Sequence, residues 1–77
     1  MKTVEEILSQ VLGIDHKSIS DSTKPEDIES WDSFNGLVLV TELEKNFDVI
    51  FTIDEISEVK NVGDIKKILK KHGINFD

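Results

Sequence analysis

The sequence predicts an all-α fold, a small up-down four-helix bundle of three main helices and one short helix, with a long loop after the first helix. Apolar residues recur at the helical spacing in three long segments and one short one. Strand alternation is weak. Residues 49–53 have strand propensity but no partner strand, so we expect a buried loop segment there. A chain of 77 residues is long enough for a single domain, residues 1–77.

A capping signal marks the start of the first helix. Thr3 and Glu6 have the spacing of a capping box, in which each side chain accepts a hydrogen bond from the other residue's backbone. Residues 14–32 then form a connection rich in Ser, Asp, Glu and Lys. Loops of this length are usually functional or anchored, and we expect Ile19 and Ile28 to dock on the bundle. The apolar face of the first helix consists of Val4, Ile7, Leu8, Val11 and Leu12.

Each later helix also follows a residue that can cap its first turn. The second long helix is expected to run from Asp32 or Ser33 to about residue 46, with the Asp32 charge at the positive end of the helix dipole. The remaining helices and their candidate N-caps are about 54–59, with Thr52 or Asp54, and about 62–71, with Asn61.

The charge and the amino-acid composition exclude some classes of function. The net charge is −7, which is the wrong sign for a nucleic-acid binder and favours basic protein partners. Residues 1–59 carry most of the negative charge, with 14 acidic residues against 4 lysines.

Because there is no cysteine, any thiol must come from an added group. No apolar signal segment follows Met1, and the longest apolar run, residues 37–40, cannot span a membrane. We expect a cytoplasmic monomer without membrane insertion.

The second long helix carries two apolar faces, whereas a surface helix needs only one. Either this helix is buried on two sides, or the second face is kept exposed for a partner. The first face, a core stripe, contains Leu39, Val40, Leu43 and Phe47. The second face contains Phe34, Leu37, Val38 and Thr41, and is flanked by Glu42 and Glu44.

Ser33 lies at the start of this helix, beside the second apolar face. Free backbone N–H groups and the helix dipole would favour a phosphodiester at this position, although an Asp32–Ser33 pair alone can equally be an ordinary helix cap. We interpret His16, in the loop, and His72, after the last helix, as surface residues. A nucleophile–base pair is therefore not expected. The sequence also contains no Gly-rich phosphate-binding loop and no cluster of metal-ligating residues.

The segment Asp32-Ser33-Phe34 resembles the Asp-Ser-Leu signature of acyl carrier proteins, with Phe in place of Leu. The resemblance covers nearly the whole chain, including residues 43–48 and 59–62. It implies that Ser33 is the attachment point for 4′-phosphopantetheine, which a phosphopantetheinyl transferase supplies from coenzyme A. Asp32 would help to present the serine to that enzyme and its metal ion. The carrier itself would be non-catalytic, holding acyl intermediates as thioesters for acyl-loading and acyl-transferring enzymes.

Departures from the family pattern indicate a specialised carrier. Val38 stands where fatty-acid carriers commonly have Glu, Lys45 lies where they are commonly more acidic, and Trp31 replaces a small residue. These differences favour polyketide, peptide, polysaccharide or cell-wall modification over housekeeping fatty acid synthesis. The alternative is a helical module without the modification, which binds a partner through Phe34, Leu37 and Val38.

The resemblance also implies a lining for the acyl chain between the second helix and the short third one. Ile56 belongs to this lining and stands where a small residue such as Ala is frequent. A larger side chain there would favour a closed interior, so we expect a short, branched or polar acyl group that stays outside, or a chain that is held loosely. The lining positions are Val40, Leu43, Ile56 and Val59.

Overall fold

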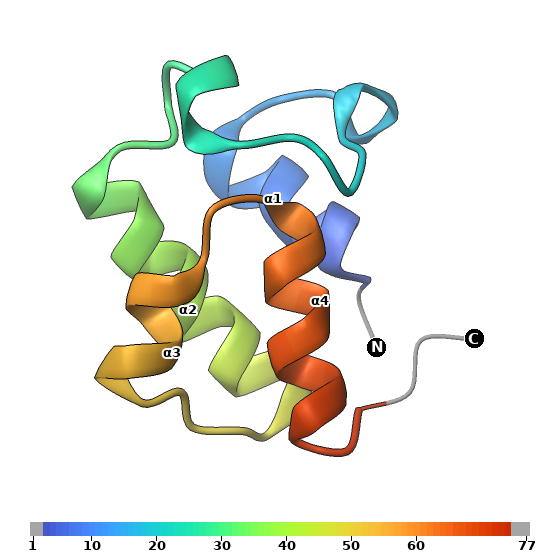
Figure 1. Cartoon of the computed structure of the whole chain (residues 1–77). Helices are drawn as coiled ribbons and strands as arrows, with labels where there is room; N and C mark the ends of the chain where they lie inside the picture. The colour runs from blue at the N-terminus through green and yellow to red at the C-terminus, as the bar shows by residue number, and fades with distance from the viewer. Residues whose placement is uncertain (1–2, 75–77) are drawn as a thin grey trace.

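The structure, a computed structural model, describes residues 3–74, and every regular element in that range is a helix (Figure 1). The predicted all-α bundle is confirmed. No helix of the described range is long and apolar enough to cross a membrane. Met1, which bears on the signal-peptide expectation, lies outside the described residues. The helices are α1 (Val4–Leu12), α2 (Ser33–Phe47), α3 (Ile53–Glu58) and α4 (Val62–Lys71), with 3₁₀ turns η1 (His16–Ser18) and η2 (Pro25–Asp27) in the long loop.

Side-chain caps determine where the long helices begin. In α1 the Glu6 N–H donates to Thr3 Oγ1 at 3.1 Å, and the Thr3 N–H donates to Glu6 Oε1 at 3.2 Å. In α2 the Asn35 N–H donates to Asp32 Oδ1 at 2.8 Å, and Asn61 caps α4 in the same way. These bonds satisfy N–H groups that have no partner within the helix, which is why the predicted starts agree with the structure.

The short helix α3 begins at Ile53, slightly before the predicted range, because Thr52 is its cap. The Glu55 N–H donates to Thr52 Oγ1 at 3.1 Å, and the Thr52 N–H donates to Glu55 Oε1 at 2.9 Å. Helix α2 extends to Phe47 and ends at Asp48, which has a left-handed φ of 54°. Aspartate tolerates this conformation better than most residues do.

The connection between α2 and α3 is a loop, as expected, but only part of it is buried. Phe51 packs in the core, whereas Ile50 is 80% exposed and Ile53 is 84% exposed. The expectation of a buried segment is therefore wrong for these two isoleucines. Successive side chains of an extended segment point to opposite sides, so burial of Phe51 turns Ile50 outward.

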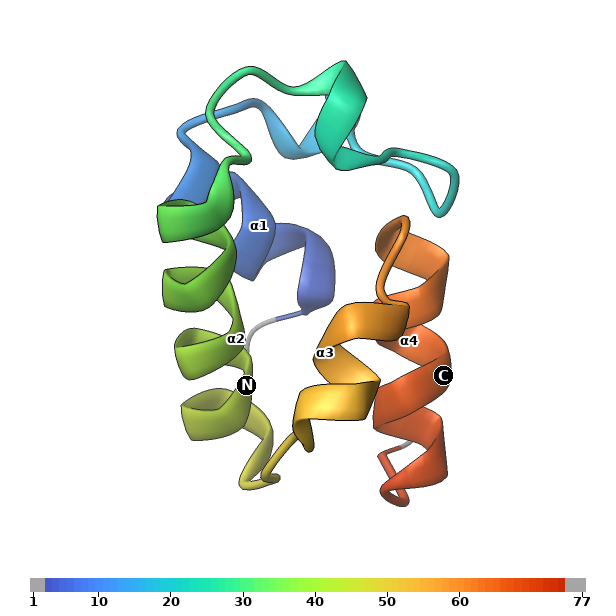
Figure 2. The ribbon, with the colours of Figure 1, turned by 60° about the vertical axis from the view of Figure 1, so that its left-hand side comes forward.

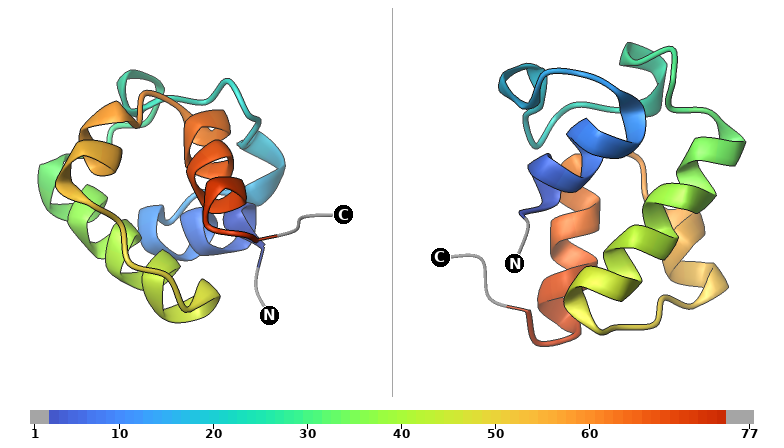
Figure 3. Two further views of the ribbon diagram at one scale, coloured as in Figure 1. Left: turned by 60° about the horizontal axis from the view of Figure 1, so that its bottom comes forward. Right: turned by 180° about the vertical axis from the view of Figure 1, so that it is seen from behind.

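The helices surround one apolar core. Figures 1 and 3 show α1 and α3 on opposite sides of the pair formed by α2 and α4. Figure 2 shows the long loop crossing the end of the bundle at which α2 and α4 begin. The buried apolar residues are Val4, Ile7, Leu8, Leu12, Ile19, Trp31, Leu39, Leu43, Phe47, Phe51, Val62, Ile65, Ile68 and Leu69.

The long loop is attached to the bundle by side chains and by its backbone. Ile19 is buried and Ile28 packs against the core, so the predicted docking is confirmed. The Gly63 N–H of α4 donates to the Asp21 carbonyl oxygen at 2.8 Å. A Cβ on Gly63 would lie only 3.2 Å from that oxygen, so glycine permits this close approach of loop and helix.

Candidate functional site

Ser33 is the first residue of α2, and it is exposed. Its position is fixed by the preceding residue, because the Asp32 carboxylate accepts the Asn35 N–H and starts the helix. The Ser33 hydroxyl makes no hydrogen bond with another residue of the described range. The chain therefore presents a free alcohol at the positive end of a helix dipole, where an attached anionic group is stabilised.

The second apolar face of α2 is a surface of the molecule. Phe34 is 74% exposed and Leu37 is 62% exposed, while Thr41 is exposed and Val38 is partly so. The interpretation of α2 as a helix buried on two sides is therefore wrong. We call these four residues the α2 patch. Phe34 follows Ser33 directly and Leu37 lies one turn further on, so a protein that reaches the hydroxyl meets apolar side chains.

The two glutamates beside the α2 patch are less available than expected. Both Glu42 and Glu44 are only partly exposed. One Glu44 oxygen accepts the Phe51 N–H at 2.9 Å, which ties the end of α2 to the loop before α3. This carboxylate therefore satisfies a backbone group in a turn, a role that spacing along one helix does not reveal.

A cavity of about 170 Å³ lies between α2 and α3. It includes all four positions of the predicted acyl lining, and Ser33 is part of its wall. Trp31, Phe51 and Ile65 also line it, although the sequence did not single them out for this role. Burial of Trp31 just before the helix start could have been inferred from its size and apolar character. The lining residues are Pro25, Trp31, Ser33, Gly36, Leu37, Leu39, Val40, Leu43, Phe51, Ile56, Val59 and Ile65.

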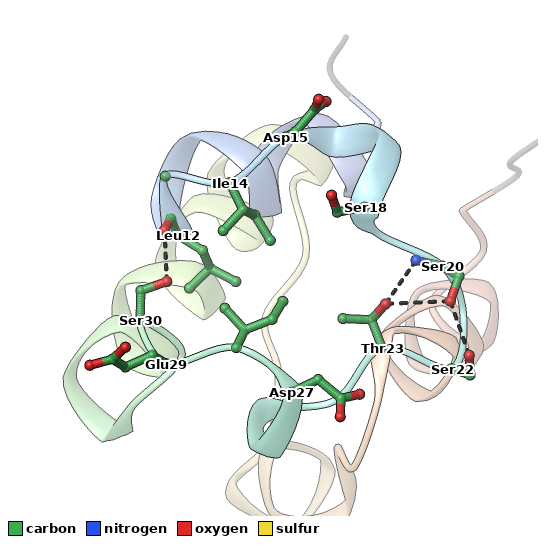
Figure 4. A pocket seen from close by; sticks show the side chains of 12 residues that line it. Leu12, Ile14, Asp15, Ser18, Ser20, Ser22, Thr23, Asp27, Glu29 and Ser30 are labelled. Atoms are coloured by element: carbon green, nitrogen blue, oxygen red, sulfur yellow. Dashed lines mark hydrogen bonds between the residues drawn. The ribbon is translucent and has the colours of Figure 1, made fainter.

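A second, open hollow of about 990 Å³ lies within the long loop (Figure 4). The Ser30 hydroxyl closes one side by donating to the Leu12 carbonyl oxygen at 2.7 Å. On the other side the Ser20 N–H donates to Thr23 Oγ1 at 2.9 Å. In Figure 4 the Glu29 carboxylate turns away from the hollow. The sequence did not predict this hollow, because it depends on how distant parts of the loop close into a ring.

Glu55 is a buried carboxylate with several hydrogen-bond donors around it. It accepts the Thr52 N–H, His72 Nε2 lies 3.1 Å from both of its oxygens, and Lys71 Nζ lies 3.4 Å from one of them. The hydrogen bonds from Thr52 and His72 outweigh desolvation and lower the pKa of Glu55 from 4.5 to about 2. His72 is exposed, as expected of a surface residue, and it also contacts the Glu55 carboxylate of α3.

The residues that could have formed a catalytic pair are not brought together. His16 is exposed in η1. His72 follows the C-terminal end of α4, which lies at the opposite end of the bundle from the start of α2 (Figure 2). Within residues 3–74, neither histidine makes a hydrogen bond to Ser33. The same range contains no group of three or more His, Asp or Glu side chains placed to hold a metal ion.

Comparison with known proteins gives the family. A family model described as a phosphopantetheine attachment site matches residues 2–69. Curated relatives include an acyl carrier protein of Clostridium acetobutylicum, 32% identical over 69 residues that cover 90% of each chain. Another is an acyl carrier protein of Karelsulcia muelleri, 26% identical over 72 residues, 94% of this chain and 87% of the other. The chain therefore belongs to the acyl carrier protein family, whose members are carriers with covalently attached 4′-phosphopantetheine.

Proposed function

We propose that this chain carries acyl intermediates as thioesters on a 4′-phosphopantetheine arm joined to Ser33. The single observation that carries this assignment is the exposed, unengaged Ser33 hydroxyl at the first position of α2. The arm supplies the thiol, which this cysteine-free chain does not have. The protein's own part is to hold the attachment point and to present it to enzymes.

Asp32 has two roles in this proposal. As the N-cap it fixes the geometry of the helix start through its bond to the Asn35 N–H. Its carboxylate also lies next in sequence to Ser33, where it can help to present the hydroxyl to a phosphopantetheinyl transferase and that enzyme's metal ion. Once the phosphodiester has formed, the helix dipole stabilises its negative charge by about 0.3–1 kcal/mol.

The α2 patch is the proposed docking face for the transferase and for the acyl-loading and acyl-transferring enzymes. Phe34 and Leu37 are large apolar side chains that remain exposed within two turns of Ser33. Exposed apolar surface of this kind commonly marks a contact with another protein. Because those partners perform the reactions, the chain itself is proposed to act as a non-catalytic, monomeric carrier in the cytoplasm.

The proposed pathway is a specialised one, such as polyketide, peptide, polysaccharide or cell-wall modification. The support comes from the surface of α2, where Val38 is partly exposed and Lys45 is exposed. Neither residue gives this surface the acidic character that is common in fatty-acid carriers. Loading the holo-protein with candidate acyl groups, using enzymes from each pathway class, would identify the pathway.

Intact-protein mass after incubation with coenzyme A and a broad-specificity phosphopantetheinyl transferase tests the proposal. The wild-type chain should gain one phosphopantetheine, and Ser33→Ala should gain none. Ser57→Ala, which alters another exposed serine, should still be modified. A Ser33→Ala chain that gains the group would overturn the assignment. A wild-type chain that gains nothing would favour an interaction module that does not need the modification.

A further inference from the structure

Trp31 is buried beside the attachment site, yet its indole N–H has no hydrogen-bond partner among residues 3–74. The side chain is only 8% exposed, and it lines the cavity whose wall includes Ser33. The backbone N–H of Trp31 donates to the Ile28 carbonyl oxygen at 3.0 Å, but the indole Nε1 donates to no residue of that range. An indole nitrogen can only donate, and buried tryptophans usually find an acceptor for it. The missing acceptor therefore needs a physical explanation.

The indole N–H is not sealed inside the core. Every side-chain nitrogen or oxygen of residues 3–74 that is cut off from solvent has a hydrogen-bond partner. Because Nε1 has none, it keeps access to space outside the packed core. A Cβ on Gly36 would lie 3.9 Å from Nε1. The nitrogen is therefore close to the surface of α2, at a position where the helix has no side chain.

The cavity offers a bound group almost no other polar contact. Apart from Trp31 and Ser33, the residues that line it are aliphatic residues, a phenylalanine, a proline and a glycine. Attachment of the arm turns the Ser33 hydroxyl into a phosphodiester and removes its O–H donor. Among the described lining residues, the indole N–H is then the one side-chain donor left. An acyl oxygen that enters this cavity loses its water and can regain a side-chain hydrogen bond only there.

We propose that Trp31 Nε1 donates a hydrogen bond to an oxygen of the acyl cargo, so that the cavity selects oxoacyl or hydroxyacyl groups over saturated ones. This inference rests on the proposed function, since the cargo must be carried on Ser33. A saturated chain displaces water from the N–H without replacing its hydrogen bond, whereas an oxygenated chain of the same length replaces it. In an apolar site, a few polar groups of this kind determine specificity.

Two acyl groups of equal length, hexanoyl and 3-oxohexanoyl, test the proposal. A broad-specificity transferase loads each from its coenzyme A thioester onto Ser33, and the holo-protein without an acyl group is the reference. Trp31 is the only tryptophan, so the isotope-labelled protein has one indole N–H resonance. A hydrogen bond deshields its proton. The resonance should therefore lie further downfield in the 3-oxohexanoyl protein than in the hexanoyl protein or the holo-protein.

Trp31→Phe removes the donor and keeps an aromatic ring. In the wild-type chain the 3-oxohexanoyl protein should melt about 4 °C above the hexanoyl protein, the shift expected for one hydrogen bond in a domain of this size. That difference should vanish in Trp31→Phe. Val59→Ala, which alters another lining residue and keeps the indole, should retain it. A difference that persists in full in Trp31→Phe would overturn the inference.

The wild-type resonances decide the matter even if Trp31→Phe does not fold. Equal positions in the two acyl proteins would overturn the inference, because the N–H would then bind the thioester common to both or nothing at all. A holo-protein resonance already at the 3-oxohexanoyl position would make the arm the acceptor and overturn it as well. A wild-type chain that is never modified would refute the proposed function itself, a result distinct from all of these.

Discussion

His72 Nε2 lies 3.1 Å from each oxygen of the Glu55 carboxylate, so the short helix α3 is tied to the residue that follows α4. The same carboxylate caps α3 through the Thr52 N–H. The Phe51 and His72 rings are also neighbours, with centroids 6.1 Å apart. Because α3 forms one wall of the cavity beside Ser33, these contacts hold that wall in place.

Acid should loosen this attachment. The pKa of Glu55 is lowered in the folded state from 4.5 to about 2, so its ionised form stabilises the fold above about pH 4.5. That contribution should disappear as the pH falls from 4.5 towards 2. Glu55→Gln keeps a residue that can complete a capping box but has no charge to lose. Its melting temperature should therefore fall less steeply than that of wild type over this range. Parallel curves for the two proteins would contradict the role given to Glu55.

A carboxylate placed in the α2 patch should weaken partner binding without unfolding the protein. Val38 is partly exposed, so Val38→Glu should change stability by only about 0.5 kcal/mol. It should nevertheless slow transfer of phosphopantetheine, because the partner's apolar socket would have to desolvate a charge. Ile50→Glu, at an exposed apolar residue beyond the other end of α2, is the control and should leave the rate unchanged. A collapsed melt for Val38→Glu would mean that this side chain supports the core.

The helix boundaries could be predicted because they depend on local chemistry. Thr3, Asp32 and Asn61 each accept a backbone N–H a few residues later in sequence, so the signal and its partner are adjacent in the chain. Ser33 could be singled out for the same reason. By contrast, Lys66 bridges Glu5 of α1 and Asp21 of the loop, and this contact exists only after the elements have packed together.

The parts of the site that the sequence did not predict depend on tertiary contacts. Glu55 reads as an ordinary exposed helix residue until His72 and Lys71 are brought against it. Ile50 and Ile53 read as buried because of their side chains, yet only Phe51 between them reaches the core. Hydrophobicity alone does not say which member of an apolar run faces inward when most of the run lies in a loop and its last residue, Ile53, only begins a helix.

Added salt should stabilise the protein. Residues 1–59 contain 14 acidic residues against 4 lysines, so like charges repel one another in the folded state. The screening length is about 8 Å at physiological ionic strength, which is short enough to weaken much of this repulsion. The melting temperature should therefore rise with NaCl and with millimolar Mg²⁺. If it stays constant from low to physiological ionic strength, repulsion does not limit the stability of this fold.

The cavity between α2 and α3 sets an expectation for the cargo. Its volume of about 170 Å³ is close to that of an apolar cavity of about 150 Å³ that binds benzene. A group of about six carbons therefore has space beside Ser33, which favours a loosely held chain over an acyl group that stays outside, the two alternatives of our expectation. A longer chain would have to displace packed side chains such as Ile56, at a cost of about 1–3 kcal/mol.

Loading saturated acyl groups of increasing length on the Ser33 arm tests this limit. The melting temperature should rise up to about six carbons, since each buried methylene contributes about 0.8 kcal/mol, and should then level off. Trp31, the only tryptophan, lines the cavity, so its fluorescence should change over the same range of lengths and no further. Ile56→Ala should extend the rise to longer chains because it removes three carbons from the wall, whereas Ile50→Ala, which alters an exposed isoleucine, should not.

A steady rise to long chains in the wild-type protein would show that the bundle expands to accept them. No rise and no change in Trp31 fluorescence would show that the cargo remains outside.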